Sequence, residues 1–242
     1  MKVLKGLDNV PHFSHAVATI GSYDGVHCGH GQLIGRVVDR AKAIGGESVV
    51  ITFEPHPRIT LGRAEGLKLL STVEEKALLM ESMGVDYLVV INFDLEFSRL
   101  SHEEFIERII IGTLHIEELV VGYNHHFGHN KSGNYSYLTQ SSLRVTEVGQ
   151  HTVEDSKVSS TIVRQLIEQG DMTSAVRLLG HQYTIIGHCD QQGMLEVDSY
   201  KLLPPAGRYK AQIEGKASTI EIADSRQIRC EGFQNCKITI KI

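Results

Sequence analysis

The 242-residue sequence has no long apolar run, which excludes the simplest ways of entering a membrane. Its first ten residues contain two lysines and no continuous apolar stretch, so the hydrophobic core of a signal peptide is missing. Elsewhere no apolar run approaches the ~18–20 residues of a transmembrane helix. We therefore expect a cytoplasmic protein without a membrane partner.

The sequence also has few cysteines, and their spacing is irregular. None of the four forms a Cys-x-x-Cys pair, and no disulfide framework is evident. This pattern fits reduced thiols in a cytosolic protein. We expect no disulfide among Cys28, Cys189, Cys230 and Cys236.

Clusters of basic residues are missing as well. Lys and Arg total 24 against 29 Asp and Glu, which gives a formal net charge of −5, and no dense basic run occurs. Affinity for nucleic acids rests mainly on clustered Lys and Arg, so nucleic-acid binding is not expected.

The first 150 residues alternate strand-like apolar runs with helical patterns, as in a parallel sheet covered by helices. Ser71 and Ser101 indicate helix starts, because each is followed three residues later by a glutamate that can complete a capping box. Gly84 and Gly112 stand where these helices should stop. We predict a doubly wound, Rossmann-like α/β fold whose five parallel strands cover residues 16–21, 48–53, 86–93, 118–123 and 143–148.

The pattern changes after Ser159. Two short helical segments, 161–169 and 172–179, are followed by period-two alternation of apolar residues from 182 to 242. This alternation predicts a small all-β, barrel-like module of about 60 residues.

The most informative segment is residues 21–30, Gly-Ser-Tyr-Asp-Gly-Val-His-Cys-Gly-His, which joins a predicted buried strand to an amphipathic helix. Such a junction offers free N–H groups and the positive end of a helix dipole to an anion, and Gly29 would allow close approach. A histidine pair at i, i+3 can also bind a metal or simply be exposed. The glycine and the flanking elements favour phosphate binding by His27 and His30, with Asp24 ordering the turn.

Three further segments carry candidate chemistry. Residues 52–57 form a Pro-rich turn at the sheet edge where open α/β sheets bind ligands, although a rigid turn alone would also explain it. Ser159 to Thr161 can cap a helix, and Arg164 one turn later can offer a forked donor to phosphates. His125, His126 and His129 could bind a transition metal. No Cys or carboxylate ligand is nearby in sequence, so we expect no protein-bound metal there.

Together these segments resemble the bacterial bifunctional FAD synthetase family, whose N-terminal half is a nucleotidylyltransferase. Residues 21–30 match its Gly-x-(Phe/Tyr)-Asp-Gly-Val-His-x-Gly-His motif, and 52–57 follow at the next strand. Residues 121–128 resemble its Val-Gly-x-(Asp/Asn)-Phe-x-Phe-Gly segment, with His125 in place of the first Phe. Residues 158–164 resemble Ile-Ser-Ser-Thr-x-x-Arg.

The resemblance implies an FMN adenylyltransferase that makes FAD and pyrophosphate from FMN and ATP, with Mg²⁺ bound mostly by phosphates and water. Two alternatives stay open: transfer to another phosphorylated acceptor, motivated by His125, and a flavin- or nucleotide-binding regulator without turnover. The sequence does not indicate an oligomeric state. The resemblance assigns catalysis to His27, His30 and Arg164, ATP binding to Gly21, Tyr23, Asp24, Gly29, Ser159, Ser160 and Thr161, and FMN binding to Phe53, Pro55, His56, Pro57, Asn124, Phe127 and Gly128.

The C-terminal segment resembles the riboflavin kinase barrel that follows in that family, at residues 179–188 and 202–209. Where the family carries Gly-Arg-x-Leu-Gly-Phe-Pro-Thr-Ala-Asn, this sequence has residues 191–198, Gln-Gln-Gly-Met-Leu-Glu-Val-Asp, and it ends at Ile242 before a C-terminal catalytic segment. We therefore expect an intact adenylyltransferase domain over residues 1–180 and a truncated, degenerate kinase-like module over 181–242 without kinase activity.

Overall fold

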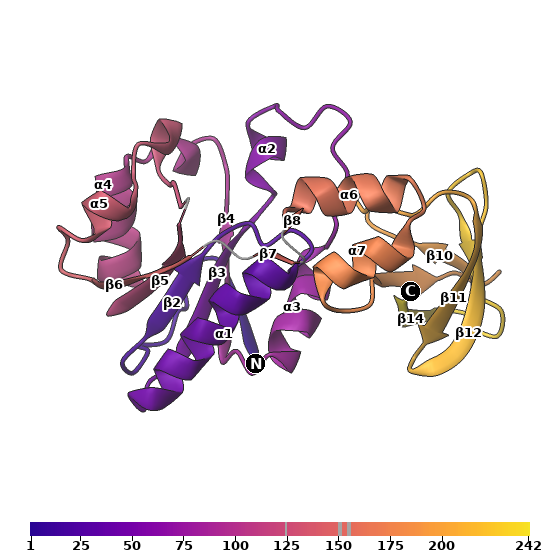
Figure 1. The fold of residues 1–242 in the computed structure, drawn as a ribbon, viewed down its shortest axis with the longest axis horizontal. Helices are drawn as coiled ribbons and strands as arrows, with labels where there is room; N and C mark the ends of the chain where they lie inside the picture. Colours follow the sequence, from indigo (N-terminus) through magenta and orange to yellow (C-terminus); the bar gives the residue numbers. More distant parts are fainter. Residues whose placement is uncertain (124, 150–151, 154–155) are drawn as a thin grey trace. The chain divides into compact units, whose positions relative to one another are not determined.

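The computed structural model describes residues 1–123, 125–149, 152–153 and 156–242. Figure 1 traces the chain, which packs into two compact units. A domain boundary between residues 180 and 181 stays a prediction. The first unit contains Met1–Tyr23, Gly29–Gly66 and Ala77–His151, and the second contains Asp24–Cys28, Leu67–Lys76 and Thr152–Ile242.

A six-stranded parallel sheet forms the centre of the first unit, in the order β1-β4-β3-β2-β5-β6. The chain adds β3 and β4 on one side of β2 and then β5 and β6 on the other. The carboxyl ends of β2 and β5 therefore mark the point where ligands of open α/β sheets bind. The strands are β1 (Lys2–Lys5), β2 (Val17–Ile20), β3 (Ser48–Glu54), β4 (Tyr87–Asn92), β5 (Glu118–Gly122) and β6 (Arg144–Val148).

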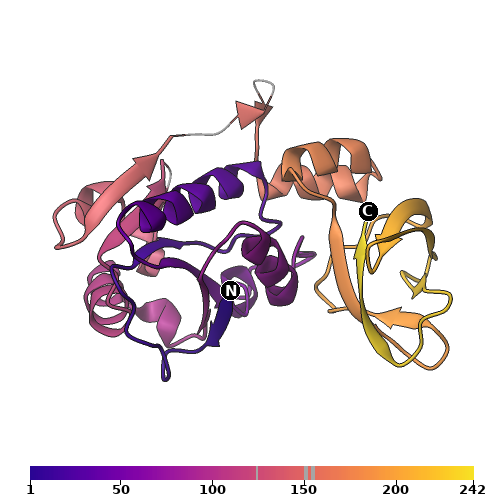
Figure 2. The same ribbon diagram turned by 90° about the horizontal axis from the view of Figure 1, so that it is seen from below.

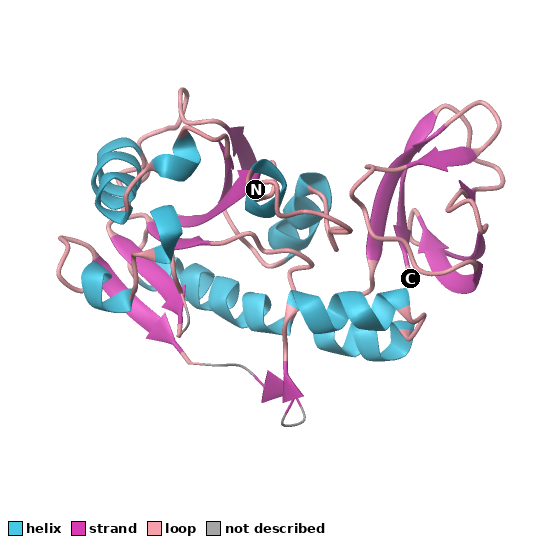
Figure 3. Cartoon of the chain, turned by 90° about the horizontal axis from the view of Figure 1, so that it is seen from above, coloured by secondary structure: helices cyan, strands magenta, loops and turns pink. Residues whose placement is uncertain are grey.

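Both faces of this sheet are covered, as the run of buried residues in β2 requires. Val17 packs against Val37 and Ala41 of α1 (Cys28–Ala43). Its neighbour Ala18 lies in a separate cluster with Ile106, on the π-helix η2 (Phe105–Thr113). Figure 3 distinguishes helices from strands, and the shorter helices of this part of the chain are α2 (Pro57–Thr60), α3 (Val73–Ser82), η1 (Phe97–Arg99), α4 (His102–Glu104), η3 (His129–Lys131) and α5 (Tyr135–Leu138).

A closed antiparallel barrel forms much of the second unit, in the order β10-β13-β12-β11-β14-β9 (Figure 2). Its strands alternate as predicted: Ile220 and Ile222 are buried while Glu221 between them is exposed. The strands are β9 (Thr184–Cys189), β10 (Met194–Glu196), β11 (Gly207–Ile213), β12 (Lys216–Ile222), β13 (Ile228–Arg229) and β14 (Cys236–Lys241), and the unit also contains β7 (Thr152–Val153), β8 (Ser156–Lys157), α6 (Ser160–Glu168) and α7 (Met172–Leu179).

The α/β class, the parallel sheet and the barrel confirm the sequence prediction, and three details correct it. The sheet has a sixth strand, β1, whose short and mostly exposed sequence carries no clear period. Thr72 and Glu75, rather than Ser71 and Glu74, form the reciprocal cap of α3. Gly112 lies inside η2 instead of ending a helix.

Two further findings concern helix length and the cysteines. Across the described residues, no helix is long and apolar enough to cross a membrane. All four cysteines are free thiols.

Candidate functional site

The chain leaves β2 through a tight turn that begins in the first unit. The Gly21 N–H donates to the Ile51 carbonyl at 3.0 Å, and Thr52 Oγ1 donates to the Ser22 carbonyl at 3.4 Å. Tyr23 follows with a left-handed φ of 46° and a buried ring. A Cβ on Gly21 would lie 3.0 Å from that ring, so a glycine suits this position.

Tyr23 and His30 meet inside the first unit. The Tyr23 hydroxyl donates to Thr19 Oγ1 at 2.8 Å, and burial raises the pKa of this phenol, so it stays protonated. The ring of Tyr23 lies edge-on to the His30 imidazole, with ring centroids 5.2 Å apart. Tyr23 therefore fixes the orientation of one motif histidine rather than offering its own hydroxyl to a ligand.

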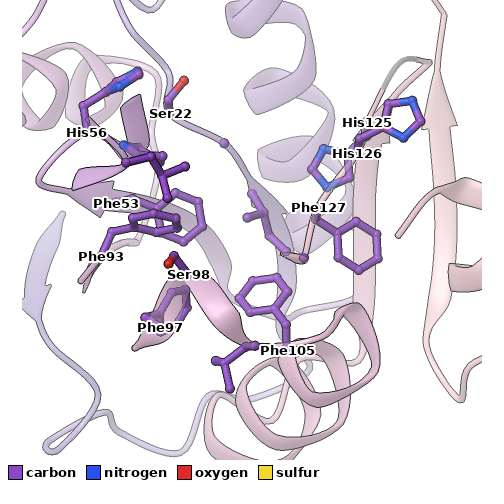
Figure 4. A pocket seen from close by; sticks show the side chains of 16 residues that line it. Ser22, Phe53, His56, Phe93, Phe97, Ser98, Phe105, His125, His126 and Phe127 are labelled. Carbon is purple, nitrogen blue, oxygen red and sulfur yellow. The ribbon is translucent and has the colours of Figure 1, made fainter. Parts of the chain in front are cut away.

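A largely aromatic pocket of about 360 Å³ lies at the carboxyl ends of the first unit's strands. Five of the seven phenylalanines in the sequence line it. They come from three stretches of the chain: Phe53 in β3, Phe93, Phe97 and Phe105 between β4 and β5, and Phe127 after β5. Neighbouring rings approach with centroids 5.4–6.1 Å apart from Phe53 through to Phe127. Figure 4 shows two groups of side chains around the pocket, Phe53, Phe93 and Phe97 on one side and His125, His126 and Phe127 on the other.

The volume and lining suit a planar ring system, since small-molecule pockets of about 300–1,000 Å³ are mostly apolar with a few polar groups. Polar groups are present at Ser22, Ser98 and His56. The His56 Nδ1 accepts the Arg58 N–H at 3.2 Å and thereby caps α2, which fixes this wall of the pocket.

The segment after β5 supplies the opposite wall and is held at both ends. The His125 N–H donates to the Gly122 carbonyl at 2.9 Å, and Phe127 exchanges two backbone hydrogen bonds with Gly133. Gly133 has no room for a side chain, because a Cβ would lie 2.6 Å from the Phe127 ring. Gly128 has a φ of +73°, and its Cβ would lie 2.7 Å from His102.

His125 lies in this wall beside His126 and Phe127. Its ring stacks on Phe127 at 5.5 Å with an interplanar angle of 27°. The Nε2 atom is buried and has no hydrogen-bond partner among the described residues. Burial, reinforced by His126, lowers the pKa of His125 to about 4, so the imidazole is neutral at physiological pH.

In the second unit, Asp24 organises the continuation of the turn. Its Oδ1 accepts the N–H groups of Leu70 and Ser71 at 2.8 and 3.1 Å, and Oδ2 accepts from Arg164 Nη2 at 2.9 Å. The sequence predicts that Asp24 orders the turn by capping N–H groups. The N–H groups that its buried carboxylate accepts belong to residues 70 and 71.

The first turn of α6 contacts the same residues. Ser160 Oγ donates to the Asp24 carbonyl at 2.9 Å, and Ser159 Oγ accepts the Ile162 N–H at 3.4 Å as the N-cap. Arg164 also donates through Nε to the Lys68 carbonyl at 2.7 Å, so two of its three guanidinium nitrogens bind protein groups. Thr161 is exposed.

The motif histidines straddle the start of α1. His27 directly precedes the helix and is buried, while Gly29 and His30 lie in its first turn. Cys28 between them donates from Sγ to the Arg177 carbonyl at 3.6 Å and fills the space beside Gly180, so it packs within the second unit.

The structure gathers the expected residues into two groups. Phe53, His56, Pro57, Phe127 and Gly128, expected at FMN, line the pocket together with Gly21, which was expected at ATP. In the second unit, Asp24, Ser160 and Arg164 contact one another around one turn, and Ser159 caps the adjoining helix. Pro55 follows a cis peptide bond and is not among the lining residues. Asn124 lies outside the described residues.

Sequence reasoning missed several residues of the pocket wall. Phe93, Phe97 and Phe105 belong to no recognised motif, and only their proximity to the ends of predicted elements could have marked them. The sequence marks residue 125 only as a departure from a motif, and nothing local indicates that its ring is buried against Phe127.

Comparison with known proteins identifies the family. The sequence profile of FAD synthetase matches residues 10–162, which is more than half of the chain. The chain belongs to the FAD synthetase family. Members of the FAD synthetase family are nucleotidyltransferases.

Curated relatives agree with the family match. The chain is 32% identical over 218 residues to the bifunctional riboflavin kinase/FMN adenylyltransferase of Listeria monocytogenes, covering 84% of the chain and 69% of the relative. It is 32% identical to the protein of that name from Bacillus subtilis, over 83% of the chain and 69% of the relative. For Pseudomonas fluorescens the identity is 34%, covering 77% and 61%. The matches to these FAD synthetase relatives therefore leave about a third of each relative unmatched.

A solved structure shares the fold of this FAD synthetase family member. The macrolide-efflux protein of Streptococcus pneumoniae superposes with a TM-score of 0.83, over 99% of this chain and 96% of that one. The identity is 22%, so this similarity concerns the fold alone.

Proposed function

We propose that this protein is an FMN adenylyltransferase that converts ATP and FMN to FAD and pyrophosphate. The observation that carries the proposal is the aromatic pocket of about 360 Å³, which five phenylalanines form at the carboxyl edge of the sheet. A flat tricyclic isoalloxazine is matched by such a lining, since stacked and edge-on aromatic contacts favour planar rings. Membership in the FAD synthetase family supports this choice of acceptor.

ATP is proposed to bind at the turn and the helix start that follow β2. His27 and His30 would donate to its phosphates, and the start of α1 would add the positive end of the helix dipole. In the second unit, Asp24 and Ser160 would hold the turn in shape. Arg164 would keep Nε and Nη2 on protein oxygens and offer Nη1 to the leaving pyrophosphate.

The proposed reaction needs no protein nucleophile. An oxygen of the FMN phosphate attacks the α-phosphorus of ATP in line, forming one P–O bond while the bond to the bridging oxygen of pyrophosphate breaks. The protein contributes alignment and stabilises the charge that builds on the phosphate oxygens. Mg²⁺ would enter as part of the MgATP substrate, because both Asp24 oxygens already accept protein hydrogen bonds.

The test is incubation of purified protein with MgATP and FMN, followed by chromatography for FAD and a coupled assay for pyrophosphate. We expect one FAD for each pyrophosphate released. Parallel reactions test the alternative that the enzyme transfers a nucleotidyl group to another acceptor. They use other phosphorylated acceptors in place of FMN, and CTP in place of ATP. Pyrophosphate release with one of those acceptors but not with FMN would replace the proposed substrate.

The proposed activity does not include riboflavin kinase. Residues 190–194 form a tight connection between β9 and β10, in which Asp190 Oδ1 accepts the N–H groups of Gln192 and Met194 at 2.7 and 2.9 Å. Its carboxylate therefore orders the protein's own turn. The resemblance aligns residues 191–198 with the family's ATP- and metal-binding motif, which this sequence lacks. Phosphoryl transfer depends on positioned metal and phosphate contacts. Purified protein given riboflavin and MgATP should make no FMN, whereas added FMN in the same mixture should yield FAD; FMN formed from riboflavin would refute this part.

A further inference from the structure

His125 combines three features that no other residue of the pocket wall has together. It lines the cavity, its ring is stacked on Phe127, and its Nε2 is buried with no hydrogen-bond partner among the described residues. A buried polar atom without a partner is costly, so native structures seldom keep one without a reason. Because His125 lines a pocket, we expect the bound ligand to supply the hydrogen-bond partner that Nε2 lacks.

The imidazole of His125 can form a hydrogen bond with such a ligand. Its backbone is fixed by the hydrogen bond to Gly122, while rotation about the Cβ–Cγ bond meets only a broad torsional preference. Because Nε2 lies close to the Cβ–Cγ axis, bringing it to a ligand in the cavity takes rotation about the Cα–Cβ bond as well, and the proposal includes this side-chain movement. The neutral ring can donate or accept one hydrogen bond according to its tautomer.

The chemistry around His125 limits what the partner can be. Phe127, Phe105 and Phe97 present apolar ring surface, which favours the faces of an aromatic ligand. A hydrogen bond from His125 then requires a polar atom at the edge of that ligand: a ring nitrogen, a ring N–H or a carbonyl oxygen. A plain hydrocarbon ring would leave Nε2 unsatisfied.

We propose that His125 determines acceptor specificity by hydrogen bonding, through Nε2, to the polar edge of the planar heterocycle that occupies the aromatic pocket. This inference rests on the proposed function, because it takes the isoalloxazine of FMN as that heterocycle. His125 then selects a ring with a polar edge, whereas the phenylalanines select only its flat shape. The same contact satisfies the buried Nε2 when the acceptor binds.

The experiment compares His125→Phe and His125→Gln with unmodified protein. Phe keeps a flat ring without the nitrogen, and Gln can restore a polar atom at similar reach. We measure the dissociation constants of FMN and of lumiflavin, which has the ring but no phosphate, by flavin fluorescence, together with KM for ATP and kcat. His125→Phe should raise the dissociation constants of both flavins by about tenfold, as expected for the loss of one hydrogen bond. KM for ATP should stay within about twofold of the value for unmodified protein. His125→Gln should recover most of the loss.

The matched control is His12→Phe, which makes the same change at an exposed residue of the first unit outside the pocket. It should bind both flavins as the unmodified protein does. If circular dichroism shows that His125→Phe does not fold, His125→Met is used instead as the apolar variant. The inference would be overturned if the apolar variant bound both flavins as tightly as unmodified protein. It would also be overturned if the variant bound FMN more weakly but lumiflavin equally well.

These outcomes also separate this inference from the proposed function. If the unmodified protein binds FMN but makes no FAD, the proposed enzyme activity fails while the role of His125 is still decided by the binding constants. If it binds neither flavin, both are overturned.

Discussion

At the scale of single residues, His30 carries the sharpest prediction for the reaction. Its imidazole is oriented by the Tyr23 ring and lies in the first turn of α1, where the proposed ATP site would place a phosphate. His30→Ala removes a donor needed mainly in the transition state, so kcat for FAD formation should fall by about a hundred- to a thousandfold. A steady-state FAD assay measures this fall. The melting temperature should stay close to that of the control His12→Ala; near-normal turnover would show that the motif is wrongly assigned.

His125 makes a second residue-scale prediction, which concerns stability and pH. Its pKa is about 4 in the folded protein and about 6.5 when unfolded. Between these values the unfolded chain binds more protons, so the stability is full above about pH 7 and falls as the pH decreases toward 4. At pH 5 the loss should be about 2 kcal/mol relative to pH 7.5.

Urea unfolding at the two pH values checks this prediction. His125→Phe should lack that part of the pH dependence, whereas His12→Phe should keep it. An identical pH dependence in unmodified protein and His125→Phe would mean that residue 125 does not stay neutral in the folded state.

At the scale of elements, the pocket wall after β5 depends on a glycine. Gly133→Ala would place a Cβ 2.6 Å from the Phe127 ring, which must then shift. Overpacking of this kind costs about 1–3 kcal/mol, and we expect weaker FMN binding as well, because Phe127 lines the pocket. The readouts are urea unfolding and flavin fluorescence.

Gly35 provides the matched control for this change. It lies within α1, and a Cβ there would have nothing within 4 Å. Gly35→Ala should be neutral or more stable by up to about 1 kcal/mol, because alanine favours a helix. Equal effects of the two substitutions would contradict the packing argument.

Elements also show where local sequence signals are reliable. The Ser101–Glu104 capping box forms as predicted, because it depends on residues only three apart. A helix from Ser101 to about Gly112 is predicted and forms, ending at Thr113, but its π geometry over Phe105–Thr113 has no local signature in the sequence. The Leu114 N–H donates to the Ile109 carbonyl, five residues back, and buried Phe105, Ile106 and Ile110 hold the helix against the sheet.

At the scale of the whole molecule, the second unit is assembled from segments far apart in the sequence, and a buried ion pair joins two of them. Lys201 Nζ donates to Glu75 Oε2 at 2.7 Å and to the carbonyls of Leu70 and Thr184 at 2.7 and 2.6 Å. Both charged side chains are fully buried. Lys201→Met should lower the free energy of unfolding by about 3–5 kcal/mol, because it leaves Glu75 buried without its counter-ion.

The adjacent glutamate supplies the control. Lys237 pairs with Glu74, and both side chains are more than half exposed. Lys237→Met should cost less than about 1 kcal/mol by the same urea measurement. If the two lysine variants lose the same stability, burial does not distinguish these pairs.

The sequence by itself determined the fold class, the order of most elements and the position of the turn that is proposed to bind phosphate. These depend on local information: alternation of apolar residues, helix caps, and glycines and histidines placed between a strand and a helix. It also determined family membership, since residues 21–30 and 158–164 carry motifs that need no knowledge of the fold.

Only the tertiary structure decided which residues form the aromatic pocket and how the candidate catalytic groups are held. Five phenylalanines from separate segments converge because the carboxyl ends of parallel strands meet at one edge, which no local pattern encodes. Likewise, Asp24 binds residues 46 and 140 positions away in the chain, and His125 became a candidate specificity residue only when its unpartnered nitrogen was seen beside Phe127. Side-chain burial and hydrogen-bond partners are set by long-range packing, so the sequence could name these residues without showing what they do.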